Sequence, residues 1–285
     1  MKLAHLAIAI CVPILWGLGF TLTKAGLGTI PPMFLMGMRY SIAALVLIWF
    51  VKPPKGVMTQ VFWVAVISGT IPYGMVFSGL KDLYASTAIL VVQLQIPFMA
   101  ILGVVLLKEK MRLRQILGMV LAFVGVVLIT GEPQIQENPF PIFLVVVGGA
   151  IWAFGQVQIR KIGRFVTGTQ LLSWVAAFSA PQLFFASFLM EEGQFGALQS
   201  AGPQEWGVIL YIGLIMTAFC YPLWYRLLAE VEVTRIAPFL LLNPLSAVVF
   251  SILILGENMT PMVLLGGTVV LSGIGVMTIQ RAKPS

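Results

Sequence analysis

The sequence has little charge. Only 9% of its 285 residues are Asp, Glu, Lys or Arg, whereas 59% are hydrophobic, and the mean hydropathy is +1.01. A soluble domain carries ~25% charged and ~45–50% apolar residues, so a soluble fold is excluded. The apolar residues form continuous runs, whereas a membrane β-barrel would need shorter strands of alternating polarity. The sequence therefore predicts an all-α integral membrane protein that lies in a lipid bilayer.

Long polar stretches are also lacking, because apolar runs occupy most of the chain. A run must have ~20 residues to cross a bilayer as a helix. Ten runs approach or exceed that length, at residues 3–23, 33–51, 60–80, 84–107, 113–130, 140–158, 169–190, 205–225, 233–255 and 262–280. No small-x-small cleavage site follows the first run, so we expect it to remain as the first transmembrane helix.

Histidine, cysteine and catalytic motifs are scarce. The single histidine, His5, excludes most His-based metal sites and His-dependent triads. Cys11 and Cys220 lie in apolar runs, where free cysteine behaves as a small hydrophobe. There is no H-E-x-x-H or G-x-S-x-G motif. We therefore expect no enzyme, with no catalytic residue, metal or cofactor. A membrane scaffold or sensor would want a soluble output domain, for which no chain is left.

The few charges are unevenly distributed. If the N-terminus is cytoplasmic, the outer loops hold only Lys24 and Lys81 among the basic residues. The cytoplasmic set is Lys2, Lys52, Lys55, Lys108, Lys110, Arg112, Arg114, Arg160, Lys161, Arg164, Arg226, Arg281 and Lys283. Lys and Arg near span ends set orientation, so both termini are expected in the cytoplasm and the protein in the cell inner membrane. The net charge of +7 is then a topology signal, and no nucleic acid is expected as a partner.

Part of the sequence is written twice. ILWGLGFTLTKAG at 14–26 returns as IWAFGQVQIRKIG at 151–163, and the Glu, Met and Gly positions of 106–125 return in 254–273. The repeats divide the chain into halves at 1–131 and 132–285, each with five runs. Five is odd, so the second half enters the membrane inverted. Transporters built from inverted repeats bind substrate near the midplane and expose it to either side by alternating access.

Three stretches carry a family resemblance. They are WGLGFTLTKAGLGTIPPMFLMGMRY (16–40), VVQLQIPFMAILGVVLLKEKMRLRQILGMVLAFVGVVLI (91–129) and VTRIAPFLLLNPLSAVVFSILILGENMTPMVLLGGTVVLSGI (233–274). They resemble EamA-type transporters of the drug/metabolite transporter superfamily, over nearly the whole chain. The resemblance implies ten helices in two five-helix repeats and the export of amino acids or related metabolites. It does not fix the substrate.

Arg39 is the clearest candidate for a substrate ligand. It lies ~10 Å along a helix from Pro32, at ~1.5 Å per residue, and an ionisable residue within a span is a functional candidate. It could bind a substrate carboxylate, because a guanidinium grips carboxylates with two parallel hydrogen bonds. It could also snorkel to the outer interface. Lys24 and Arg160 end their runs and are expected to be structural.

Polar and aromatic side chains elsewhere in the runs complete the candidate site. An amide in a span needs hydrogen-bond partners, so it either binds substrate or joins helices. Trp and Tyr near mid-span either line a cavity or pack. The full set of candidate substrate ligands is Trp16, Arg39, Tyr73, Gln93, Gln95, Trp152, Gln156 and Asn243. Of the neighbours Gln93 and Gln95 we expect one ligand and one helix contact, and favour Gln93 as the ligand.

Acids are absent from the middle of the runs. This absence argues against proton coupling through a buried carboxylate and against the export of bulky cations. The sequence favours a secondary exporter of amino acids or related small metabolites, with a multidrug or other small-organic-compound exporter as the alternative. Glycines of 113–130 and 262–280 recur at seven-residue spacing and predict close helix packing or a homodimer contact.

Overall fold

The computed structural model describes residues 2–108, 110–162, 165–231 and 236–278, and within these ranges every regular element is a helix. The first half contains α1 (Leu3–Gly26), α2 (Pro32–Leu47) with η1 (Ile48–Phe50), α3 (Met58–Val64), η2 (Ala65–Thr70), α4 (Ile71–Asp82), α5 (Ala85–Val92), α6 (Gln95–Leu107) and α7 (Leu113–Thr130). The short helix α8 (Pro133–Glu137) follows.

The second half repeats this order. It contains α9 (Phe140–Ile162), α10 (Gly168–Met190), α11 (Gln194–Ser200), α12 (Pro203–Leu210), η3 (Tyr211–Phe219), α13 (Cys220–Glu230), η4 (Ala237–Leu241), α15 (Leu242–Leu255) and α16 (Pro261–Thr278). In the described residues, nine helical segments are long and apolar enough to cross a membrane, and Phe239–Leu255 is a shorter tenth. The start of the ninth predicted run, residues 233–235, lies outside the described residues.

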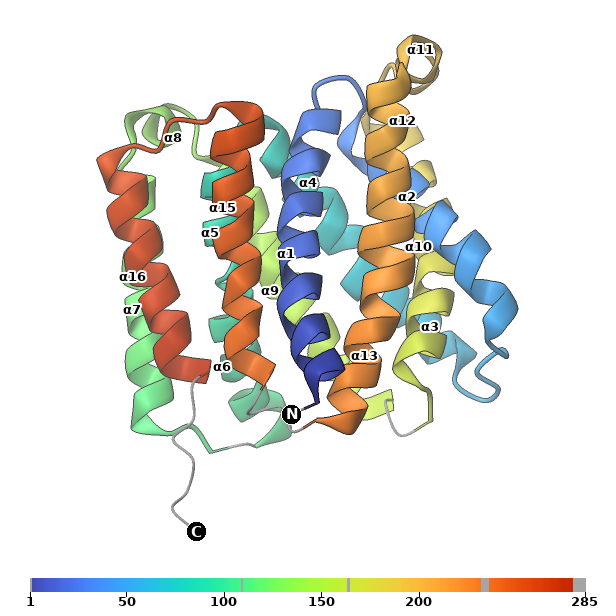
Figure 1. The fold of residues 1–285 in the computed structure, drawn as a ribbon, viewed down its shortest axis with the longest axis horizontal. Coiled ribbons are helices and arrows are strands. Elements are labelled where there is room, and N and C mark those ends of the chain that lie inside the picture. The colour runs from blue at the N-terminus through green and yellow to red at the C-terminus, as the bar shows by residue number, and fades with distance from the viewer. Residues whose placement is uncertain (1, 109, 163–164, 232–235, 279–285) are drawn as a thin grey trace.

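The halves are inverted relative to each other. The chain begins at one end of the bundle, where α1 starts, whereas α9 starts at the opposite end beside α8 (Figure 1). The contacts between helices follow the same symmetry. The first helix of each half packs on the fourth span of the other, α1 on α15 and α9 on α5 and α6, and the second helices, α2 and α10, pack on each other. The protein is thus a multi-pass membrane protein of two inverted five-helix repeats, as the sequence predicts.

Four of the spans are interrupted, at matching places in the two halves. The third and eighth spans contain π-helical segments, η2 and η3, close before Pro72 and Pro222. The fourth span turns at Gln93 and Leu94, because Pro97 has no amide hydrogen for the Gln93 carbonyl and Ile96 N donates to it instead at 3.0 Å. In the ninth, the 3₁₀ segment η4 precedes α15. The structure therefore breaks runs that the hydropathy pattern shows as continuous.

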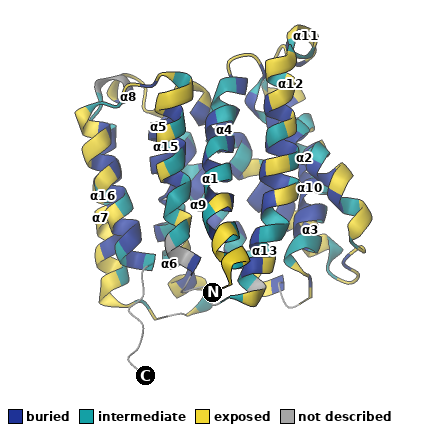
Figure 2. Cartoon of the chain, in the orientation of Figure 1, coloured by how far each residue is buried: buried dark blue, intermediate teal, exposed yellow. Residues whose placement is uncertain are grey.

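Helices α7 and α16 pack against each other through glycine. A Cβ atom built on Gly118 would lie 2.5 Å from the carbonyl oxygen of Gly273, and one on Gly125 would lie 2.6 Å from that of Gly266. Only hydrogen in place of a side chain permits this approach. The predicted close packing is confirmed within one chain, and a homodimer stays a prediction. The outward faces of α7 and α16 are largely exposed (Figure 2, yellow). Their exposed residues include Leu117, Val124 and Leu264, and such apolar side chains suit contact with lipid.

Candidate functional site

Arg39 lies buried at the middle of α2. The residue is 1% exposed, so the alternative that it snorkels to the interface is wrong. Its Nε donates a hydrogen bond to Oγ1 of Thr217 at 2.8 Å. Its Nη1 is buried and has no hydrogen-bond partner among the described residues. Arg39 thus keeps a donor free in the interior.

Aromatic rings surround this guanidinium. Its Cζ lies 5.2 Å from the ring centroid of Tyr73 and 5.7 Å from that of Tyr40, and Tyr221 also interacts with it. A cation within ~6 Å of a ring centroid is attracted by the ring quadrupole. The Tyr221 ring in turn lies 4.9 Å from that of Trp16. The fold therefore brings together three predicted ligands, Trp16, Arg39 and Tyr73, and adds Tyr40, Tyr221 and Thr217.

The π-helical segments position these side chains. Thr217 lies in η3, where its hydroxyl donates to the carbonyl of Ile212 at 2.7 Å and accepts from Arg39. Tyr221 precedes Pro222 and Tyr73 follows Pro72, so both tyrosines stand beside a residue that cannot donate to the helix ladder. Such local windings are frequent at functional sites.

Trp16 has a packing role as well. Its Nε1 donates to the carbonyl of Met216 at 3.1 Å, and its ring packs against Trp224 at a centroid distance of 5.5 Å. Trp152, its counterpart in the second half, is only partly buried. The repeat therefore places both tryptophans near mid-span, but only Trp16 belongs to the Arg39 cluster.

The predicted amides do not join this cluster by any hydrogen bond. Gln93 is buried and donates to the carbonyl of Ile89 in its own helix at 3.2 Å, so it joins no second helix by this bond, and its role as the ligand stays a prediction. Gln95 faces Gly149, and Gln156 lines a separate cavity of about 270 Å³ between α6 and α9. The Oδ1 of Asn243 is buried without a hydrogen-bond partner among the described residues.

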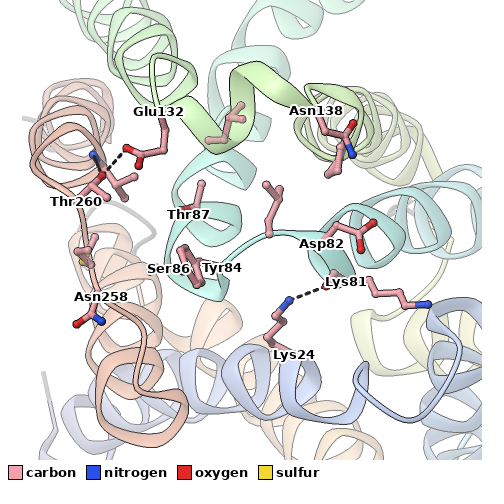
Figure 3. A pocket seen from close by; sticks show the side chains of 15 residues that line it. Lys24, Lys81, Asp82, Tyr84, Ser86, Thr87, Glu132, Asn138, Asn258 and Thr260 are labelled. Atoms are coloured by element: carbon pink, nitrogen blue, oxygen red, sulfur yellow. Dashed lines mark hydrogen bonds between the residues drawn. The ribbon is translucent and has the colours of Figure 1, made fainter.

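A second cavity, of about 290 Å³, opens at the end of the bundle opposite the N-terminus and is lined by residues of both halves. Figure 3 shows Lys24, Lys81 and Asp82 on one side and Glu132, Asn258 and Thr260 on the other. The Nζ of Lys24 donates to the carbonyls of Leu80 and Lys81, at 3.1 and 2.7 Å. Its structural role is thus to cap the C-terminus of α4, a neighbouring helix.

Two carboxylates join the halves beside this end. Glu257 is 6% exposed and accepts from Ala85 N at 2.5 Å, Ser86 N at 3.0 Å and Ser86 Oγ at 2.6 Å. Glu191 accepts from Met33 N and Phe34 N at 2.8 and 3.2 Å. Each acid satisfies amides at the start of a helix in the other half, where negative charge is favoured. Sequence reasoning noticed Glu257 only as a repeated position. Glu109, its repeat partner, and Arg235 lie outside the described residues.

Comparison with known proteins gives a consistent result. The profile of the EamA-like transporter family matches residues 3–131 and again 139–279. A protein of Salmonella typhimurium named "Probable amino-acid metabolite efflux pump" is 30% identical over 275 residues, which cover 94% of this chain and 92% of that protein. Its namesake in Escherichia coli is 29% identical over 276 residues. A solved structure with 20% identity covers 97% of this chain and 96% of its own at a TM-score of 0.64, which shows a shared fold.

Proposed function

Because the chain belongs to the EamA-like transporter family, we propose that it exports amino acids or related small metabolites from the cytoplasm across the inner membrane. The proposed halves, 1–131 and 132–285, rock about the midplane and expose the site to each side in turn. No chemical step on the substrate is required, so the protein acts as a transporter and not as an enzyme.

The observation that carries this proposal is the buried Arg39 with its free Nη1. Every amino acid and many of its metabolites carry a carboxylate, and a guanidinium binds carboxylates with directional, charge-assisted hydrogen bonds. Trp16, Tyr40, Tyr73 and Tyr221 supply apolar surface for the rest of the molecule. The site lies among interrupted spans, as expected for a transporter of inverted repeats.

The charge distribution supports the orientation of the protein in the membrane. Lys52, Lys108 and Arg112 follow or precede spans at the N-terminal end of the bundle, whereas Glu132 and Glu257 lie at the opposite end. Basic residues favour the cytoplasmic side, so the N-terminal end faces the cytoplasm. The cavity beside Lys24 then faces the outside, and the hydrogen bonds of Glu257 and Glu191 join the two halves on this side.

The alternative is an exporter of other small organic compounds. Cationic substrates of such an exporter would be repelled by the positive charge of Arg39, whereas neutral substrates could bind to the aromatic side chains alone. We also propose further substrate ligands for a second conformation of the transporter, in which their side chains face the substrate pathway. They are Gln93, Gln95, Trp152, Gln156 and Asn243.

Efflux from liposomes tests the proposal. The purified protein is reconstituted and a panel of labelled solutes is followed: cysteine, O-acetylserine, threonine, aromatic amino acids and a quaternary amine. We expect flux of at least one carboxylate-bearing solute and its loss in Arg39→Gln, while Arg226→Gln, an exposed site, serves as control. Flux of the amine alone would move the protein to the drug-export class, and no flux of any solute would refute the proposal.

A further inference from the structure

The charge of Arg39 has no counter-charge in the structure. Arginine is protonated at all physiological pH values, and burial of an unpaired charge is costly. No carboxylate of the described residues lies within ion-pair distance of Arg39, whose contacts are the uncharged side chains of Thr217 and Tyr221 and the rings of Tyr40 and Tyr73. The described acids lie at helix ends or in connecting segments. The side chains of this cluster therefore carry a net positive charge in a low-dielectric interior.

From this arrangement we infer that the site selects substrates with a net negative charge. The ligand class is a carboxylate with an apolar body whose amino group is missing or acylated, in preference to a zwitterionic amino acid. This inference rests on the proposed transport function and sharpens its substrate class.

The reason is electrostatic. A monoanion neutralises the guanidinium and can use the free Nη1 donor, so the loaded site has no net charge. A zwitterion brings an ammonium as well, which leaves the loaded site with a net charge of one and with a like charge near the guanidinium. In an interior of low dielectric constant, the attraction between guanidinium and carboxylate and the repulsion between guanidinium and ammonium are both larger than in water.

Few acceptors are placed to bind such an ammonium. The hydroxyl of Thr217 donates to Ile212 and accepts from Arg39, so its hydrogen-bonding roles are in use. The faces of Tyr40 and Tyr73 already contact the guanidinium, and the tyrosine hydroxyls of the cluster bond to one another and, through Tyr221, to Arg39. A buried acceptor without a described partner is Oδ1 of Asn243, which is uncharged. It offers a specific rival to the inference, since an amide oxygen could receive the ammonium of a zwitterion.

A matched ligand series tests the inference on the unmodified protein. Four compounds share one aromatic body: phenylalanine is a zwitterion, N-acetylphenylalanine and 3-phenylpropanoate are anions, and phenylalaninamide is a cation. Binding is followed by intrinsic tryptophan fluorescence, since Trp16 lies in the cluster, and efflux of each labelled compound from liposomes is followed in parallel. We expect the anions to bind at least tenfold more tightly than phenylalanine, and phenylalaninamide to show no saturable binding.

Two variants separate the interpretations. Arg39→Gln should remove the preference for the anions, and it should retain a monodisperse elution profile because it removes a charge that has no partner. Asn243→Leu should leave the ratio between anion and zwitterion unchanged. Phenylalanine binding and flux that match or exceed those of the anions would overturn the inference and leave amino-acid export standing. A zwitterion preference lost in Asn243→Leu would overturn it in favour of the amide. Absence of flux for all four compounds and for the amino-acid panel would refute the proposed function itself.

Discussion

Substitution of Glu257 provides a quantitative test of the contact that closes one end of the bundle. Its Oε1 accepts from Ala85 N, and its Oε2 accepts from Ser86 N and Ser86 Oγ. Because the residue is 6% exposed, water replaces these bonds poorly when they are lost. Glu257→Ala leaves the first amides of α5 without an acceptor, and we expect it to lower the free energy of unfolding by about 2–4 kcal/mol, from the loss of a helix cap and of charge-assisted hydrogen bonds.

Glu257→Gln should have a smaller effect. Its single amide oxygen can occupy the Oε2 position and keep both bonds from Ser86, whereas the amide nitrogen then faces the N–H of Ala85, so the charge and the bond from Ala85 are lost and the side chain must turn to separate two donors. We expect a loss of about 1–2 kcal/mol, since a hydrogen bond to a charged group contributes about 1.5–3 kcal/mol and part of it is retained as a neutral bond. Stability is measured by denaturant unfolding in a fixed detergent, and the exposed acid Glu192 supplies the control Glu192→Gln.

A second measurement follows the opening of the cavity. Thr87 is 3% exposed and lines the outer cavity, so a cysteine placed there in a background of Cys11→Ala and Cys220→Ala should react slowly with a bulky thiol reagent. Weakening the contact at Glu257 should increase that rate several-fold. If Glu257→Ala unfolds at the same denaturant concentration as its parent and leaves the labelling rate unchanged, the contact does not hold the two halves together and the reasoning is wrong.

Three further substitutions test the packing and the surface. Gly125→Leu should separate α7 from α16 and destabilise the protein by about 1–3 kcal/mol or more in the same assay, whereas Gly207→Leu, with no atom within 4 Å of its Cβ position, should have little effect. Trp16→Phe should cost about 1 kcal/mol through the bond to Met216 O, and an unchanged stability would show that this bond contributes nothing. The pKa of Glu230 is lowered by hydrogen bonds from Arg226 and His5, so the ionised carboxylate stabilises the fold above its ordinary pKa of ~4.3, and this stabilisation is lost on acidification. Glu230→Gln should therefore remove this part of the pH dependence of the unfolding midpoint, measured from about pH 7 to about pH 3.

Much of this fold follows from local features of the sequence. Continuous apolar runs predict helices because a backbone in lipid must satisfy its own hydrogen bonds. The glycine spacing in α7 and α16 predicts their approach, and the internal repeat predicts the inversion of the second half. These inferences hold because each depends on the geometry of one helix or on a repeat that can be read directly.

The site itself is less predictable, because its contacts join distant parts of the chain. Arg39 meets a residue 178 positions away, and its burial depends on where α2 and η3 lie in the bundle. Gln93 shows the converse: its position predicts a polar group in the membrane, but a side-chain torsion turns its amide back to Ile89. Tyr40 and Tyr221 resemble other aromatic residues in the runs, and nothing local distinguishes them from packing residues.

The symmetry of the fold does not extend to the chemistry of the site. The pair formed by α2 and η3 has a counterpart in α10 and η2, since each joins the second helix of one half to the interrupted third helix of the other. The first pair holds Arg39 and Thr217, whereas the second holds Thr70, which donates to Gln182 at 2.5 Å. Duplication thus supplies two similar contacts between helices, and only one of them carries a charge, on which the proposed preference for anions rests. In the proposed mechanism the two halves rock as similar units, and the one asymmetric charge is the feature from which the proposed substrate class follows.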